Sequence, residues 1–163
     1  MDAKCSIEGR IEDIMTNNPT LTPDEKLQLE FNRWAEAGEG EKMEQHHLDI
    51  TLKTLRLMDL RPGQRVLDLG CGSGWATRLL ARTVLDESGS SARNEAHVAG
   101  LDVSDEMIRL ARETSRGFSN LTYVVGSASQ VPWGRITSLI AFFPSNLFIT
   151  IPTRVLRSTN FSE

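Results

Sequence analysis

The first apolar pattern of the chain has the period of an amphipathic helix. Thr22, Pro23 and Glu25 have the order of a capping box with proline at the first helical position. The apolar residues that follow at helical spacing are Leu27, Phe31 and Trp34. We predict a helix that ends near residues 38–40, and we expect its two aromatic rings to lie in the apolar core.

A second helical pattern runs from Met43 to Leu60 and ends at the turn residues 61–63. The leucines that share one face of this helix are Leu48, Leu52 and Leu55. His46 and His47 are adjacent, so their side chains diverge by about 100° and at most one can face a site. We favour a surface pair; one histidine on a substrate side is the alternative.

Residues 65–128 alternate short apolar runs with helical patterns. The apolar runs are 66–69, 97–103 and 121–125, and a helical pattern follows each of the first two. Ser104 is placed as an N-cap before two acidic residues, which a helix dipole favours at that end. The polar segment 87–96 predicts a long loop. This order predicts an α/β fold with a parallel sheet and right-handed crossovers.

The last part of the chain has a different pattern. Residues 136–143 and 147–151 are apolar enough for a fourth and a fifth strand. No helical period lies between them, so we expect parallel pairing to be hard to complete here. The apolar stretch 136–151 also predicts a protein contact or an aggregation hazard.

Composition narrows the class of protein. A length of 163 residues fits one domain. The formal net charge of −4, from 22 acidic and 18 basic residues, provides no basis for a nucleic-acid partner. No apolar stretch reaches the roughly 18 residues of a membrane span. Two cysteines give neither a disulfide framework nor zinc-ligand spacing with the histidines, so we expect no metal and a cytoplasmic location.

The candidate chemistry follows the first predicted strand, in VLDLGCGSG at residues 66–74. Gly70, Gly72 and Gly74 permit a tight turn and close approach of a ligand, and the next helix offers its N–H groups. Asp102 ends the second strand, which emerges beside the same crevice in a doubly wound sheet. A carboxylate there can accept hydrogen bonds from both hydroxyls of a ribose. The pattern therefore predicts a site for a ribose-bearing cofactor.

Two competing interpretations of the glycine turn are weaker. A dinucleotide site requires G-x-G-x-x-G, whereas Trp75 and Thr77 stand where its third glycine would fall. A nucleophilic Cys71 would require an adjacent base, and neither neighbour is one. We therefore interpret Cys71 as a small residue that fills the turn.

These motifs, with GLDVS at 100–104 and Met107, resemble the cofactor half of class I S-adenosylmethionine-dependent methyltransferases of the small-molecule type. The resemblance implies a Rossmann-like fold, S-adenosylmethionine as cofactor and a small-molecule methyl acceptor. By resemblance, Asp68 precedes the turn, the glycines contact the methionine part, Asp102 binds the ribose, and Val103 and Met107 flank the adenine. The cofactor-binding residues it implies are Asp68, Gly70, Cys71, Gly72, Gly74, Asp102, Val103, Met107, Ser127 and Ala128.

The chain also departs from this family. Ser127 stands where the family commonly has an acid that bonds the adenine amine, so only a neutral acceptor is offered. The segment 131–133 still resembles the family, and the resemblance stops there. Residues 66–163 are too few for seven strands with crossovers at about 30 residues per βα unit. We therefore expect a domain that is incomplete, truncated or altered after about residue 134.

These observations divide the chain into four parts. They are a leader at 1–20, N-terminal lid helices at 21–63, the S-adenosylmethionine-binding half at 64–134 and a divergent apolar tail at 135–163. The favoured function is a small-molecule methyltransferase, with no assignable catalytic base, and its enzymatic activity rests on the resemblance. The alternative is a noncatalytic truncated isoform that binds a protein partner or is unstable.

Overall fold

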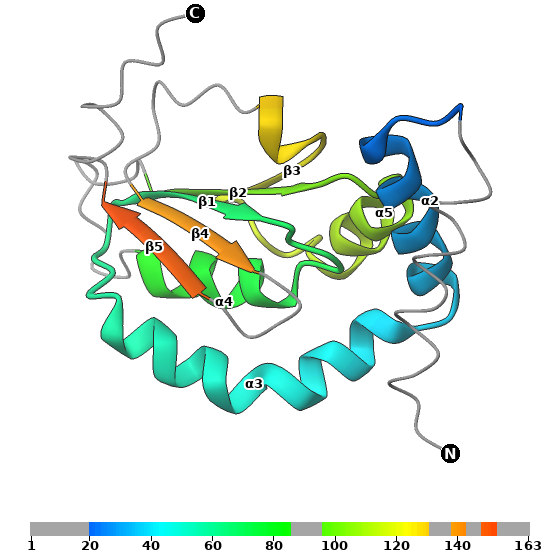
Figure 1. The fold of residues 1–163 in the computed structure, drawn as a ribbon. Coiled ribbons are helices and arrows are strands. Elements are labelled where there is room, and N and C mark those ends of the chain that lie inside the picture. The colour runs from blue at the N-terminus through cyan, green and yellow to red at the C-terminus, as the bar shows by residue number, and fades with distance from the viewer. Residues whose placement is uncertain (1–19, 86–95, 131–137, 143–147, 153–163) are drawn as a thin grey trace, which may run out of the picture.

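A five-stranded sheet forms the centre of the computed structural model (Figure 1). Its strands are β1 (Arg65–Leu69), β2 (His97–Asp102), β3 (Leu121–Val125), β4 (Ser138–Phe142) and β5 (Phe148–Pro152). The order is β3-β2-β1-β4-β5, with β1 parallel to both β2 and β4, and β2 parallel to β3. The predicted α/β, Rossmann-like fold is thus confirmed. The strand order reverses at β1, which is where open α/β sheets bind ligands.

The structure describes residues 20–85, 96–130, 138–142 and 148–152. The expected leader at 1–20 (except Thr20), the expected loop at 87–96 (except Ala96) and the segment 131–133 lie outside the described residues. So does most of the expected tail.

The two tail strands follow our expectation, because they do not pair parallel to each other. β4 instead pairs parallel to β1. The described part of the connection before β4, residues 126–130, contains the short 3-10 helix η2 (Ala128–Gln130). β5 runs antiparallel to β4, an arrangement that a short connection permits.

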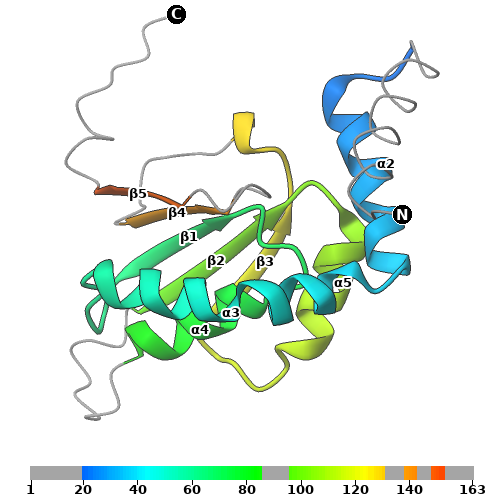
Figure 2. The same ribbon diagram turned by 60° about the horizontal axis from the view of Figure 1, so that its bottom comes forward.

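In the described part of the chain, four α-helices accompany the sheet (Figure 2). They are α2 (Pro23–Glu36), α3 (Glu39–Leu57), α4 (Trp75–Val84) and α5 (Asp105–Thr114). α4 and α5 lie on one face of the sheet, α3 runs beside α4, and α2 packs along α5. None of these described helices has both the length and the apolar character needed to cross a membrane.

The helix ends follow the predicted capping signals closely. The Thr22 side chain accepts from the Glu25 N–H, and Glu25 accepts from the Thr22 N–H at 2.7 Å, which completes the predicted capping box. Ser104 caps α5 by accepting from the Met107 N–H at 3.0 Å. α3 begins at Glu39, four residues before the predicted start, after Gly38 in the left-handed region. Gly38 is the N-cap of α3 and directly follows the C-cap of α2, so only two residues separate the two helices.

The apolar core lies between α4 and the middle of the sheet. Its buried residues are Val66, Leu80, Ala81, Val84, Ala96 and Val98. Only part of the predicted leucine face of α3 reaches it, because Leu55 packs on the core whereas Leu48 and Leu52 are 39% and 37% exposed. Thr51, offset from those two leucines, is buried instead. The face of α3 that packs inward is therefore not the face that carries Leu48 and Leu52.

Tyr123 of β3 supports the glycine turn from below. Its hydroxyl lies 2.9 Å from Ser115 Oγ and donates to the Gly74 carbonyl at 3.3 Å. A Cβ at Gly74 would lie 2.8 Å from Tyr123 Cζ and 3.0 Å from Ala111 Cβ. Gly74 is therefore required both by its backbone angle, φ 78°, and by the ring beneath it.

We predict that Gly74→Ala destabilises the fold more than Gly72→Ala. Both glycines have positive φ, but a Cβ at Gly72 meets nothing among the described residues within 4 Å. Gly72→Ala should cost about 1 kcal/mol of unfolding free energy, and Gly74→Ala about 2–4 kcal/mol, because the latter also overpacks the site. Urea unfolding measures both. Equal losses for the two variants would contradict the support role of Tyr123.

Candidate functional site

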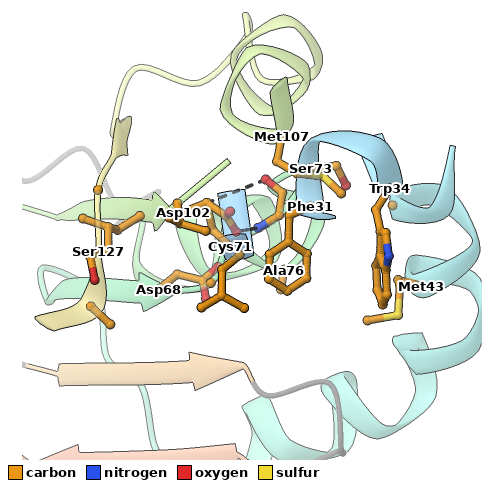
Figure 3. Close-up of a pocket in the computed structure, with 18 of the residues that line it drawn as sticks. Phe31, Trp34, Met43, Asp68, Cys71, Ser73, Ala76, Asp102, Met107 and Ser127 are labelled. Atoms are coloured by element: carbon orange, nitrogen blue, oxygen red, sulfur yellow. Dashed lines mark hydrogen bonds between the residues drawn. The ribbon is translucent and has the colours of Figure 1, made fainter. Parts of the chain in front are cut away.

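A pocket of about 340 Å³ lies at the carboxyl ends of β1 and β2 (Figure 3). Its walls come from the glycine turn, the end of β2, the start of α5, the segment after β3, and helices α2 and α3. Nine of the ten predicted site residues line it: Asp68, Gly70, Cys71, Gly72, Asp102, Val103, Met107, Ser127 and Ala128. Gly74 is not among the lining residues and packs on Tyr123 instead.

Hydrogen bonds from three backbone N–H groups hold the glycine turn against the end of β2. The N–H groups of Gly70 and Cys71 both donate to the Leu101 carbonyl, at 2.8 and 3.1 Å. The Gly72 N–H donates to Asp102 Oδ2 at 2.8 Å. The turn and the predicted ribose-binding carboxylate therefore form one unit, although thirty positions separate Gly72 from Asp102.

Asp102 is 8% exposed and each of its oxygens accepts a backbone hydrogen bond. Oδ1 accepts from the Ser104 N–H at 2.9 Å, and Oδ2 from Gly72. Burial raises the pKa of this carboxyl, and the backbone donors oppose that rise. A carboxylate oxygen has about two lone pairs, so each can accept a further hydrogen bond from a ligand.

Asp68 lies beneath the pocket and is fully buried. Thr77 Oγ1 donates to its Oδ2 at 2.7 Å, while Oδ1 has no hydrogen-bond partner among the described residues. Burial raises the pKa of Asp68 to about 7, and the nearby charge of Asp102 contributes to this rise. An unsatisfied buried oxygen beside a cavity is a place where a ligand donor would be stabilised.

Cys71 faces the same pocket but is a poor nucleophile. The side chain is 5% exposed. Burial raises the pKa of its thiol well above the ordinary value, and the charges of Asp68 and Asp102 act in the same direction. The geometry agrees with the interpretation of Cys71 as a small residue that fills the turn.

The side of the pocket next to α5 is mostly apolar. Val103 and Met107 line it together with Ala128 and Ser127. The Ser127 hydroxyl lies 2.8 Å from Ser129 Oγ and accepts from the Ser129 N–H at 3.3 Å. The Ser127 hydroxyl therefore already makes hydrogen bonds within its own turn, which leaves fewer for a ligand.

The opposite wall of the pocket comes from α2 and α3. The sequence did not predict that the apolar residues of these helices line a pocket. Figure 3 shows Phe31, Trp34 and Met43 on the side of the pocket away from Ser127. The expectation that both aromatic rings lie in the core is wrong, because α2 packs along α5 and turns its apolar stripe toward the cavity. The two rings meet edge to face, with centroids 5.4 Å apart. The helical spacing of these residues predicted a buried apolar stripe, but it did not show that the stripe faces a pocket.

Neither histidine of α3 lines the pocket, which agrees with the favoured surface pair. His46 is exposed, and its Nδ1 lies 2.7 Å from the Lys42 carbonyl. The described part of the chain holds no cluster of three or more acidic, histidine or cysteine side chains arranged for a metal.

The charges around the pocket have a single sign. The charged residues that line it are Asp24, Asp68 and Asp102. No lysine, arginine or histidine is found among the described lining residues. The pocket therefore favours ligands with cationic or neutral groups over those with an anionic phosphate.

We predict that Asp68 makes the stability of the fold depend on pH. Its carboxyl is protonated in the folded chain up to a pKa of about 7, whereas an ordinary aspartate has a pKa of about 4. The folded state binds more protons between these values, so its unfolding free energy falls as the pH rises across that window. Asp68→Asn should remove up to about 1.4 kcal/mol per pH unit of this decline.

Urea unfolding across this pH window measures the slope for both chains. Asp49→Asn, at an exposed position of α3, is the matched control and should keep the slope of the unmodified chain. The same slope in Asp68→Asn and the unmodified chain would show that Asp68 is ionised in the folded state throughout.

Known proteins resemble this chain over its middle part. Residues 60–138 match the family model of a methyltransferase domain. The chain is 42% identical over 88 residues to a ubiquinone/menaquinone biosynthesis C-methyltransferase of Legionella pneumophila (strain Paris), which covers 54% of this chain and 33% of that protein. It is 36% identical over 72 residues to phosphoethanolamine N-methyltransferase 1 of Arabidopsis thaliana, covering 44% of this chain and 13% of that protein.

A solved structure gives the same result for the fold. It is a complex between the Haloferax volcanii Trm112 methyltransferase activator and a methyltransferase, with 32% sequence identity and a TM-score of 0.54. The match covers 63% of this chain and 41% of that chain. The chain thus spans a third or less of the two curated relatives and less than half of this structure. The resemblance to S-adenosylmethionine-dependent methyltransferases is thus confirmed over residues 60–138, which match a methyltransferase domain.

Proposed function

We propose that the pocket binds S-adenosylmethionine and that the chain is a methyltransferase for a small, apolar acceptor. One observation carries the proposal: Asp102 is held by two backbone N–H groups against a glycine turn whose Gly72 leaves open space. The turn and the carboxylate would thereby bind the methionine part and the ribose of the cofactor. The lid role of residues 21–63 and the cofactor role of residues 64–134 are parts of this proposal.

The chemistry of the pocket suits this cofactor. S-adenosylmethionine carries a sulfonium and an ammonium group, and the carboxylates of Asp24 and Asp102 attract cations. The free oxygen of Asp68 offers an acceptor to such a ligand, and Val103 and Met107 offer apolar contacts to an adenine ring. The cavity volume lies within the usual range for cofactor sites, about 300–1,000 Å³. A pyrophosphate-bearing dinucleotide would instead bring anionic charge beside these carboxylates.

The acceptor class follows from the α2 and α3 wall. Leu27, Phe31, Trp34 and Met43 line the pocket there, and the described lining offers no cation to a phosphate group. Two of the similar proteins are a quinone-biosynthesis C-methyltransferase and a phosphoethanolamine N-methyltransferase. The wall favours a neutral apolar acceptor of the first kind, because burying an unpaired phosphate beside carboxylates is costly.

The residues of this chain act by binding, orienting and excluding water. The bound cofactor supplies the activated methyl group. Asp102 and the glycine turn hold the cofactor, while the aromatic wall of α2 orients the acceptor and keeps water away from it. We assign no general base for the acceptor, so positioning is the contribution that we propose for this chain.

We predict that S-adenosylmethionine binds saturably and that Asp102→Asn weakens its binding at least about tenfold. An asparagine amide would point its NH₂ group at the Gly72 or the Ser104 N–H, which are both donors. Isothermal titration calorimetry measures the Kd, with Asp49→Asn as a matched control and NAD as the control ligand. A folded chain with no affinity for S-adenosylmethionine, or equal affinity for NAD, would refute the proposal.

We predict that Phe31→Ala raises the KM for the acceptor more than the Kd for the cofactor. The Phe31 ring lines the α2 wall of the pocket together with Trp34. Removing it should weaken acceptor binding about tenfold through lost apolar contact. Methyl transfer to demethylmenaquinone, in its oxidised and reduced forms, and to phosphoethanolamine is the assay. Faster transfer to phosphoethanolamine would overturn the apolar acceptor class.

A further inference from the structure

A set of polar contacts connects helix α2 to the start of α5. The carbonyl oxygen of the Asn32 side chain accepts from Ser104 Oγ at 2.6 Å. Its amide nitrogen donates to Asp105 Oδ1 at 2.9 Å. One side chain of α2 therefore contacts two successive residues that lie more than seventy positions further along the chain.

Ser104 continues this path to the pocket. The residue is fully buried, and its backbone N–H donates to Asp102 Oδ1 at 2.9 Å. Asp102 accepts from the Gly72 N–H through its other oxygen. Hydrogen bonds thus run without a break from Asn32 through Ser104 and Asp102 to the glycine turn. Ser104 and Asp102 are buried, so these two members of the path have few alternative partners and can transmit a change in position.

The position of Asn32 also determines which face of α2 meets the pocket. Phe31 and Trp34 line the cavity, whereas Asn32 and Gln28, one turn apart, both contact Asp105. Adjacent residues of a helix diverge by about 100°, so α2 cannot rotate about its axis while the Asn32 contacts persist. The aromatic wall is therefore oriented by a residue that does not line the pocket.

The chemistry of the Asn32 side chain matches both partners. The serine hydroxyl requires an acceptor and the Asp105 carboxylate requires a donor, and an amide provides one of each. The hydrogen bond from Asn32 is the main cause that lowers the pKa of Asp105, so the contact favours the ionised carboxylate.

We propose that Asn32 is a positioning residue that holds α2 over the pocket and, through Ser104, holds Asp102 against the glycine turn. The inference rests on the proposed function, in which Asp102 binds the ribose of the cofactor. Cofactor affinity and the orientation of the aromatic wall then depend on the same side chain.

Asn32→Asp tests the proposal with almost no change in side-chain size. The variant replaces the amide donor with a carboxylate that faces Asp105, and like charges repel. In the cofactor-free chain, amide hydrogen exchange of α2 and of the Gly72 N–H should become about tenfold faster. The Kd for S-adenosylmethionine should rise about tenfold as well.

A second variant provides the rescue. Asn32→Asp combined with Asp105→Asn exchanges donor and acceptor, so the contact can form again in the opposite sense. Both readouts should return to within about threefold of the unmodified chain. Gln28→Ala is the matched control, because it removes a 3.3 Å contact to the same Asp105 oxygen without touching Ser104. It should leave the Gly72 exchange rate unchanged.

The outcomes separate this inference from the proposed function. Faster exchange in α2 with unchanged exchange at Gly72 would show that Asn32 holds the helix alone, and the coupling would be wrong. Failure of the double variant to recover, or an equal effect of Gln28→Ala, would also overturn it. A chain that binds no S-adenosylmethionine would refute the proposed function, while the cofactor-free exchange at Gly72 would still decide the role of Asn32.

Discussion

The site depends on the contact between the Asp102 carboxylate and the backbone of the glycine turn. A buried carboxylate is costly unless its oxygens are satisfied. Gly72 and Ser104 supply the donors from two different segments, so the charge of one strand end organises both the turn before α4 and the start of α5. The Leu101 carbonyl, which accepts from Gly70 and Cys71, adds the backbone part of the same junction.

This junction explains why other features of the pocket cluster around it. Tyr123 fills the space beneath Gly74, so the turn has no room to relax downward. Asp68 lies beneath the turn with a raised pKa and one oxygen without a described partner. Burial, a raised pKa and incomplete hydrogen bonding thus gather at one place, a combination that is common at ligand sites.

Helix α2 completes the pocket, and none of its described residues packs in the apolar core beside α4. α2 is held on α5 by side-chain hydrogen bonds through Asn32, and its apolar stripe is thereby left for the cavity. Apolar residues at helical spacing thus serve recognition here, although the same spacing in α4 builds the core beside Val66 and Val98. The difference arises from the surface on which each helix lies.

The sequence by itself determined the succession of strands and helices along residues 65–128, the capping box of α2, the N-cap of α5 and the turn with its acid one strand later. These features depend on local rules: periodicity, capping and the backbone freedom of glycine act over a few residues. Only the tertiary structure decided that Phe31 and Trp34 face the pocket, that Thr51 is buried instead of Leu48, and that Asn32 reaches Ser104. Those outcomes depend on how helices rotate against their neighbours, and contacts between residues seventy positions apart leave no local signal in the chain.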